Sequence, residues 1–227
     1  MLAILFSGGK DSVLTAFRAI REGKKIACLV TLKSNARDSY MFHIPAMNMV
    51  SLQAVAMGIP LIMEESSGIK EEELKDIERA LLRAKKEFRI TEVGAGALHS
   101  KYQYDRVAAI AKKLGIGVYA PLWQRDQEEH VQEIIDSGFD ARIVGIASKG
   151  LDESWLGRRI DSGLLRELKA LHGKYGVHIG GEGGEYESLV VDCPVFRERL
   201  ELIETEKRME NECTGSLEIA KARLIPK

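Results

Sequence analysis

Short apolar runs alternate with longer segments of helical period through the first half of the chain. Between residues 11 and 21, for example, Val13, Leu14 and Phe17 fall near one helical face. Strands are predicted at 2–6, 26–32, 61–63, 93–98 and 118–120. This alternation is typical of βαβ units, whose strands are parallel. The N-terminal part is therefore predicted to be a Rossmann-like α/β domain with a mostly parallel sheet.

The pattern changes after Trp123. Helices are expected near 128–136 and 162–175, a strand at 141–146, and strand-like alternation at 189–193 and 216–224. Because strands and helices no longer alternate one for one, this part is predicted to be a smaller α+β domain. A boundary near Gln124 divides the chain into an N-terminal domain, 1–124, and a C-terminal domain, 125–227.

Composition excludes several classes of protein. The 227 residues carry 33 Lys+Arg against 34 Asp+Glu, a formal net charge of −1. This net charge lacks the positive excess that is typical of stable nucleic-acid binding. The three cysteines, Cys28, Cys193 and Cys213, form no C-x-x-C pair, which argues against a disulfide framework or a local zinc site. No apolar run is long enough to span a bilayer or to form a signal peptide. A cytoplasmic protein without a membrane partner is expected.

The sequence S-G-G-K-D-S at 7–12 stands directly between the first strand and the first helix. Its two glycines let the backbone turn N–H groups toward an anion, and Lys10 adds a positive charge. The N-terminus of the helix adds partial positive charge, and Ser7 and Ser12 add hydroxyl groups. Asp11 is expected either to cap the helix or to hold Mg²⁺. A phosphate site is the favoured interpretation, and a plain tight turn is the minor alternative.

This loop is neither a Walker A motif nor a dinucleotide fingerprint, because the spacing of its glycines differs from both. It resembles the signature of the N-type ATP pyrophosphatases, in which the loop holds the pyrophosphate that leaves during adenylation. The resemblance implies that 1–124 is a HUP-type Rossmann-like domain that binds ATP, with Mg²⁺ as a further cofactor, and that 125–227 is the substrate-binding domain. Positive groups at the leaving pyrophosphate would lower the barrier to attack on the α-phosphorus.

A second motif, G-G-E-G-G-E-Y-E-S at 180–188, sets three carboxylates among four glycines. Like charges this close raise one another's pKa values unless a cation compensates them. A bound cation is the favoured interpretation, and an exposed acidic turn is the alternative.

Together the two motifs resemble the diphthine–ammonia ligase family, in its minimal archaeal-type form. Agreement at 96–98, 102–103, 106–107, 121–123, 156–157 and 192–194 extends the similarity over nearly the whole chain. The resemblance implies that ATP adenylates the carboxylate of diphthine, a modified histidine on elongation factor 2, and that ammonia then displaces AMP. Tyr104, Ala108 and Ser188 depart from the family's usual residues, and these departures concern contacts with the protein substrate more than ATP chemistry.

Diphthine carries a trimethylammonium group, which favours carboxylates and aromatic faces. One of the three glutamates of the second motif, with Tyr186 or Trp123, is expected to contact it, and Mg²⁺ coordination is the competing role. Catalytic roles are expected for Lys10, Asp11, Glu182 and Glu185, with Asp11 as the metal ligand. ATP is expected to contact Ser7, Gly8, Gly9, Lys10, Asp11, Ser12, Leu32, His43 and Gly94. The substrate is expected to contact Tyr102, Gln103, Arg106, Trp123, Gly183, Gly184, Glu185, Tyr186 and Glu187.

Some of these residues have ordinary structural alternatives of similar weight. Leu32 and Gly94 belong to strands whose carboxyl ends are where open α/β sheets bind ligands, but a core leucine and a simple bend explain them as well. His43 precedes a helix and is as readily structural. Tyr102, Gln103 and Arg106 are equally compatible with an ordinary surface.

Two other functions share the first motif: a tRNA-modifying enzyme that adenylates a base carbonyl, and a non-catalytic ATP-binding sensor. The lack of paired cysteines argues against thiolation, and the acidic second motif favours chemistry over sensing. Free ammonium is the expected nitrogen source, because no glutaminase-like pairing of cysteine and histidine is evident. The oligomeric state, including a homodimer, stays open.

Overall fold

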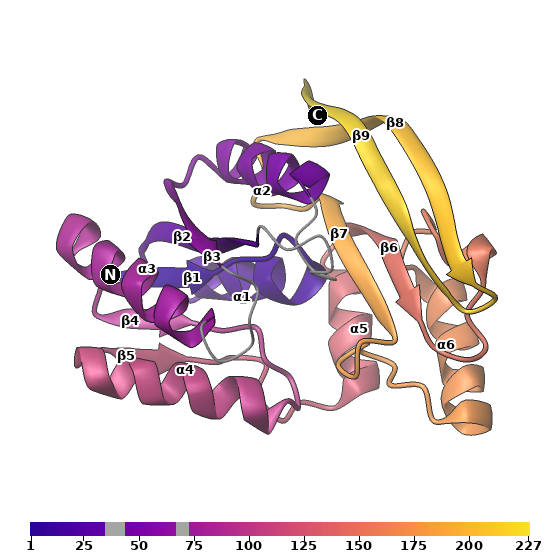
Figure 1. Cartoon of the computed structure of the whole chain (residues 1–227), viewed down its shortest axis with the longest axis horizontal. Coiled ribbons are helices and arrows are strands. Elements are labelled where there is room, and N and C mark those ends of the chain that lie inside the picture. The colour runs from indigo at the N-terminus through magenta and orange to yellow at the C-terminus, as the bar shows by residue number, and fades with distance from the viewer. Residues whose placement is uncertain (35–43, 67–72) are drawn as a thin grey trace. The chain divides into compact units, whose positions relative to one another are not determined.

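The computed structural model describes residues 1–34, 44–66 and 73–227. The chain divides into two compact units (Figure 1). The first comprises Met1–Ser7 and Asp11–Trp123, and the second comprises Gly8–Lys10 and Gln124–Lys227. The middle of the loop at 7–12 is therefore grouped with the C-terminal unit, although the residues on either side of it belong to the N-terminal unit.

The first unit is built on a five-stranded parallel sheet with the order β3-β2-β1-β4-β5. Its strands are β1 (Leu2–Leu5), β2 (Ile26–Ser34), β3 (Leu61–Ser66), β4 (Glu92–Gly94) and β5 (Gly117–Tyr119). Its helices are α1 (Lys10–Arg21), α2 (Ile44–Met57), α3 (Glu73–Phe88) and α4 (Lys101–Leu114). The predicted Rossmann-like architecture is confirmed. Within the described ranges, no helix has both the length and the apolar character needed to cross a bilayer.

The strand order reverses at β1. The chain moves outward from β1 through β2 to β3, and then returns to the other side of β1 for β4 and β5. In open α/β sheets, ligands bind outside the carboxyl ends of the strands at such a reversal. The segments that leave β1 and β4 therefore occupy the part of this sheet where a ligand is expected.

Helices α3 and α4 cover one face of the sheet and form a continuous apolar core with it. Cys28 and Val30 of β2, Leu81 of α3 and Ile110 of α4 are buried there. Burial raises the pKa of the Cys28 thiol to about 12. The thiol therefore stays protonated and unreactive at neutral pH.

The second unit contains an antiparallel sheet with the order β7-β6-β9-β8. Its strands are β6 (Asp140–Ala147), β7 (Tyr186–Asp192), β8 (Glu198–Asn211) and β9 (Thr214–Pro226). Its helices are α5 (Gln127–Asp136), the 3₁₀ helix η1 (Glu153–Trp155) and α6 (Ser162–Tyr175). The predicted α+β class is confirmed. Strand β8, which forms a long hairpin with β9 (Figure 1), has no counterpart among the predicted strands.

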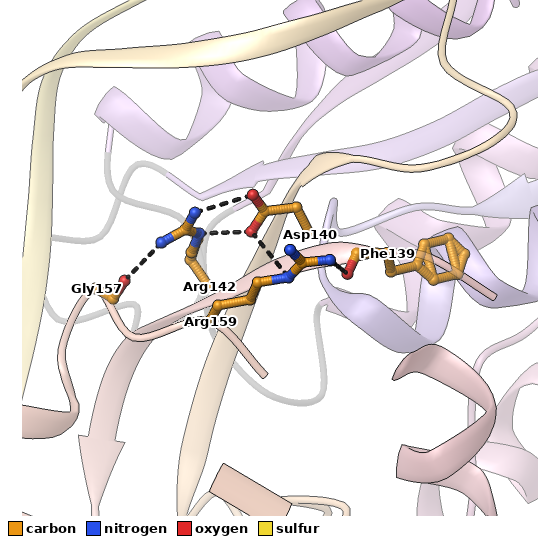
Figure 2. Close-up of polar contacts among 5 residues, drawn as sticks. All are labelled: Phe139, Asp140, Arg142, Gly157 and Arg159. Atoms are coloured by element: carbon orange, nitrogen blue, oxygen red, sulfur yellow. Dashed lines mark hydrogen bonds and ion pairs between the residues drawn. The ribbon is translucent and has the colours of Figure 1, made fainter. Parts of the chain in front are cut away.

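A cluster of polar side chains holds the segment that follows η1 against β6. Arg142 donates to both carboxylate oxygens of Asp140, at 2.5 and 2.9 Å, and to the carbonyl of Gly157 at 3.4 Å (Figure 2). Arg159 lies 3.9 Å from the same carboxylate and donates to the carbonyl of Phe139 at 3.1 Å. The backbones of Arg142 and Arg159 also form a β-bridge. Paired hydrogen bonds between an arginine and a carboxylate fix the relative positions of the two side chains closely. The role of this cluster is therefore to hold the segment after η1 on β6.

Gly94, at the end of β4, supports a test of packing in the parallel sheet. A Cβ atom on residue 94 would lie 2.4 Å from Cδ1 of Ile4 and 3.5 Å from the carbonyl oxygen of Ala3. Because Ile4 would have to leave a closely packed position, Gly94→Ala is expected to lower the free energy of unfolding by about 1–3 kcal/mol. Urea unfolding followed by circular dichroism measures this change.

The matched control is Gly173→Ala in α6. A Cβ atom there would meet nothing within 4 Å, so alanine is expected to be neutral or to stabilise the helix by up to ~1 kcal/mol. Equal free energies of unfolding for the two variants would contradict the packing argument.

Candidate functional site

Hydroxyl groups close the loop between β1 and α1. The backbone N–H of Ser7 donates to Oγ of Ser12 at 3.3 Å, and the two hydroxyl oxygens are also 3.3 Å apart. Ser12 is 5% exposed, and Thr15 donates to the carbonyl of Asp11 at 2.8 Å. Asp11 lies inside the first turn of α1 and is not its N-cap, so the helix dipole stabilises its negative charge.

The segment after β4 packs directly on the start of α1. A Cβ atom on Gly96 would lie 3.0 Å from the carbonyl carbon of Asp11 and 3.1 Å from the backbone nitrogen of Ser12. Glycine permits this approach because it has no side chain. The segments that leave β1 and β4 therefore meet where the strand order reverses.

The middle of the loop lies along β7. The N–H of Val190 donates to the carbonyl of Gly8 at 3.1 Å, and the N–H of Lys10 donates to Oγ of Ser188 at 3.1 Å. Lys10 is 3% exposed, and its Nζ lies 5.1 Å from the centroid of the Tyr186 ring. Gly8 has a φ of +79°, a left-handed conformation that glycine adopts without strain. The structure thus brings residues 8–10 of the first motif together with the second motif, within one unit.

A carboxylate and a histidine organise the glycine-rich part of the second motif. Oε1 of Glu185 accepts from the N–H of His178 at 3.0 Å, and Oε2 accepts from the N–H of Gly183 at 2.9 Å. Nδ1 of His178 accepts from the N–H of Gly180 at 3.1 Å and from that of Glu182 at 3.4 Å. Glu185 is therefore engaged in holding the loop, and His178 contributes to the site although no motif in the sequence marks it.

Tyr186 and Glu187 are adjacent on β7, so their side chains project to opposite faces. Tyr186 is buried, and its hydroxyl donates to the carbonyl of Ile179 at 2.6 Å. Glu187 pairs across the sheet with Gly145, where a Cβ atom would come within 3.3 Å of Oε2 of Glu187. Burial raises the pKa of Glu187 to about 7. This carboxyl group can therefore gain or lose a proton near neutral pH.

Three of the predicted substrate residues lie on the first turns of α4. The helix begins at Lys101, where Oγ of Ser100 caps it, accepting from the N–H of Gln103 at 3.3 Å. The guanidinium carbon of Arg106 lies 3.1 Å from the centroid of the Tyr102 ring. Tyr102 and Arg106 therefore form a stacked pair, with Tyr102 exposed to solvent.

Trp123 follows β5 and stacks on Tyr104 of α4. The ring centroids are 4.4 Å apart, and the planes differ by 21°. Trp123 is thus half-buried against Tyr104, one of the residues at which this chain departs from the usual family pattern. Its contact with substrate stays a prediction.

Two of the remaining predicted ATP ligands have packing roles in the sheet. Leu32 pairs with Glu64 across β2 and β3, and its side chain belongs to the apolar core. Gly94 makes room for the side chain of Ile4. His43 lies outside the described residues. Contacts of Leu32 and Gly94 with ATP stay predictions.

Magnesium chemistry can be tested against the donor groups. In the part of the chain that the structure describes, no three His, Cys, Asp or Glu residues gather closely enough to hold a metal ion by themselves. Mg²⁺ at nucleotide sites is commonly held by one or two carboxylates together with phosphate oxygens and water. Asp11, in the first turn of α1, supplies one such carboxylate, so this site fits an ion that arrives with a nucleotide.

Two family models match nearly the whole chain: the diphthamide synthase N-terminal domain over residues 1–118, and the diphthamide synthase C-terminal domain over residues 126–225. A Rattus norvegicus protein named diphthine–ammonia ligase is 34% identical over 242 aligned positions, covering 98% of this chain and 90% of that protein. A Danio rerio protein of the same name is 36% identical over 220 positions, covering 89% of this chain and 86% of that protein.

A crystal structure described as a predicted subunit of tRNA methyltransferase from Methanocaldococcus jannaschii covers 85% of this chain and 97% of its own. Its identity of 15% and TM-score of 0.45 are too low to support an argument about fold or function. The family models and the curated relatives agree with each other over both units of the structure. The chain belongs to the diphthamide synthase family.

Proposed function

We propose that this protein is a diphthine–ammonia ligase that uses ATP and ammonium to amidate diphthine on elongation factor 2. Membership of the diphthamide synthase family supports this function, as do relatives that carry the ligase name. The observation that carries the proposal is the packing of the phosphate-type loop along the second motif, through Lys10, Ser188 and Tyr186. Lys10 of the first motif and residues 186–188 of the second are therefore in contact.

In the first step, a carboxylate oxygen of diphthine attacks the α-phosphorus of ATP, and the bond to the β-phosphate breaks. The backbone around Gly8 and Gly9, the N-terminus of α1 and the side chain of Lys10 would stabilise the charge that grows on pyrophosphate. Because Lys10 is 3% exposed, water screens its charge little. Mg²⁺, held by Asp11 and the phosphates, would neutralise further charge.

In the second step, ammonia attacks the acyl carbon of the adenylate. The C–N bond forms, the bond from carbon to the AMP oxygen breaks, AMP leaves with its electron pair, and the new C–N nitrogen releases one proton to solvent. The first step needs a loop that holds the phosphates of ATP. The second step needs further residues that hold the diphthine adenylate while ammonia attacks it. Free ammonium is the proposed nitrogen source.

The test is to incubate the protein with ATP, Mg²⁺, ammonium and elongation factor 2 that carries diphthine. AMP, pyrophosphate and the mass of the factor are followed together. We expect the factor's mass to change by the replacement of OH with NH₂ as AMP and pyrophosphate appear, and omission of ammonium to stop amide formation. Pyrophosphate formed only with tRNA, or ATP binding without turnover in either mixture, would overturn the proposal.

A further inference from the structure

We infer that Ser188 and Tyr186 are positioning residues that hold the phosphate loop and Lys10 in the conformation needed for nucleotide chemistry. The inference rests on the proposed function, and it gives the second motif a role in shaping the first. It also changes the expected role of Tyr186, which the sequence suggested as a contact for the trimethylammonium group.

The first support is a pair of hydrogen bonds between the loop and β7. Strand β7 is at the end of its sheet, and its other edge pairs with β6. The side-chain hydroxyl of Ser188 accepts from the N–H of Lys10, and the backbone N–H of Val190, two residues further, donates to the carbonyl of Gly8, each at 3.1 Å. The first bond uses a side chain, and the second uses the backbone of the strand. The loop is therefore held on β7 at two points.

The second support is the position of Lys10 at the start of α1. The first N–H groups of a helix have no partner within the helix, and a side-chain oxygen commonly satisfies one of them. Here the oxygen comes from Ser188, which is 178 positions away along the chain. Ser188 thus satisfies the N–H of Lys10 as a capping side chain would, from within the unit to which Lys10 belongs.

The third support concerns the side chain of Lys10. Its Nζ lies 5.1 Å from the centroid of the Tyr186 ring, within the range of a cation–π contact. Tyr186 is 2% exposed, and its hydroxyl bond to the carbonyl of Ile179, at 2.6 Å, fixes the direction of the ring. The ring therefore limits where the ammonium group of Lys10 can lie. Electrostatic groups that are already in place need no reorganisation during the reaction.

Ser188→Ala and Ser188→Thr test the backbone contact. We expect alanine to raise the KM for ATP and the Kd of the Mg²⁺–ATP complex about tenfold, because the loop loses a fixed hydrogen bond. Threonine keeps the hydroxyl and is expected to restore both values to within about twofold. Ser216→Ala is the control, since Ser216 is also a half-buried serine on a strand of the same sheet and lies on β9. It should behave like the wild type.

Tyr186→Leu and Tyr186→Phe test the contact with the side chain. Leucine removes the aromatic face and is expected to lower kcat for pyrophosphate release about tenfold or more, with a smaller effect on KM. Phenylalanine keeps the face and should retain most of the rate. Melting temperatures of all variants identify any that fail to fold, and Ser188→Ala, which removes a single oxygen atom, carries the test if Tyr186→Leu does not fold.

Binding of Mg²⁺–ATP, measured by calorimetry, separates this inference from the proposed function. A wild type that binds ATP but does not amidate diphthine would count against the function only, and weaker binding by Ser188→Ala, restored in Ser188→Thr, would still support the inference. ATP binding and kcat unchanged in both Ser188→Ala and Tyr186→Leu would overturn the inference whatever the reaction is.

Discussion

Replacing Lys10 by alanine is expected to slow ATP-dependent pyrophosphate release by about 10²- to 10³-fold, the size typical for loss of one preorganised electrostatic group. The ammonium group is almost fully buried, lies over the ring of Tyr186 and belongs to the loop between β1 and α1. The low local dielectric strengthens its attraction for a leaving phosphate. The measurement is the initial rate of pyrophosphate release at saturating ATP.

The control for this variant is Lys24→Ala. Lys24 also lies over an aromatic ring, with Nζ 4.8 Å from the centroid of Tyr119, and it is ion-paired with Glu92 at 2.9 Å. It therefore matches Lys10 in residue type and in its aromatic contact, but it follows the C-terminal end of α1. We expect its rate to equal that of the wild type. A wild-type rate in Lys10→Ala would mean that phosphate binds elsewhere.

The predictable part of the fold is the part encoded by local pattern. The alternation of apolar runs with helical segments was enough to predict the parallel sheet, and α6 begins and ends at the predicted residues. The start of α4 carried a readable signal as well, since Ser100 followed by Gln103 fits a capping box. Local patterns predict these elements because the spacing of apolar residues within one helix or strand shows which of its faces will be buried.

Strand β8 shows why local pattern fails elsewhere. Its residues, Glu198–Asn211, are rich in Glu, Lys and Arg, and most of its C-terminal half is exposed. This composition favours a helix as much as a strand. Pairing with β9, from Glu198 opposite Pro226 to Asn211 opposite Thr214, makes it a strand. No Asn-Gly or Asp-Gly turn announces the hairpin, so the partner could not be identified from the sequence.

The candidate site was predictable in its residues but not in their contacts. The motifs at 7–12 and 180–188 can be recognised from their glycines and charges. The hydrogen bond between Lys10 and Ser188 joins positions 178 apart, and periodicity carries no information at that separation. For the same reason, the three carboxylates of the second motif looked equivalent in sequence. In the structure Glu185 binds backbone N–H groups, whereas Glu187 lies over Gly145.

Glu187→Gln is expected to change how stability depends on pH. An ordinary glutamate has a pKa of about 4.3, and burial raises that of Glu187 to about 7 in the folded protein. Below pH 4 the group is protonated in both states and favours neither. Between the two pKa values the unfolded chain releases its proton while the folded protein keeps it, so the free energy of unfolding falls as pH rises. Above pH 7 the carboxylate is ionised in both states, and the loss is complete.

The loss is expected to be on the order of 1–3 kcal/mol, reduced from the full value of the shift because the side chain is partly exposed. Glutamine cannot ionise, so the Glu187→Gln variant should gain stability relative to the wild type between pH 5 and pH 8. Urea unfolding at both pH values measures the difference, with Glu210→Gln, an exposed position on β8, as the control that should follow the wild type. The row across the sheet from Glu187 continues with Gly145 and Ser216, neither of which can supply a compensating charge. A constant difference between wild type and Glu187→Gln at the two pH values would therefore mean that the carboxylate is solvated in the folded protein.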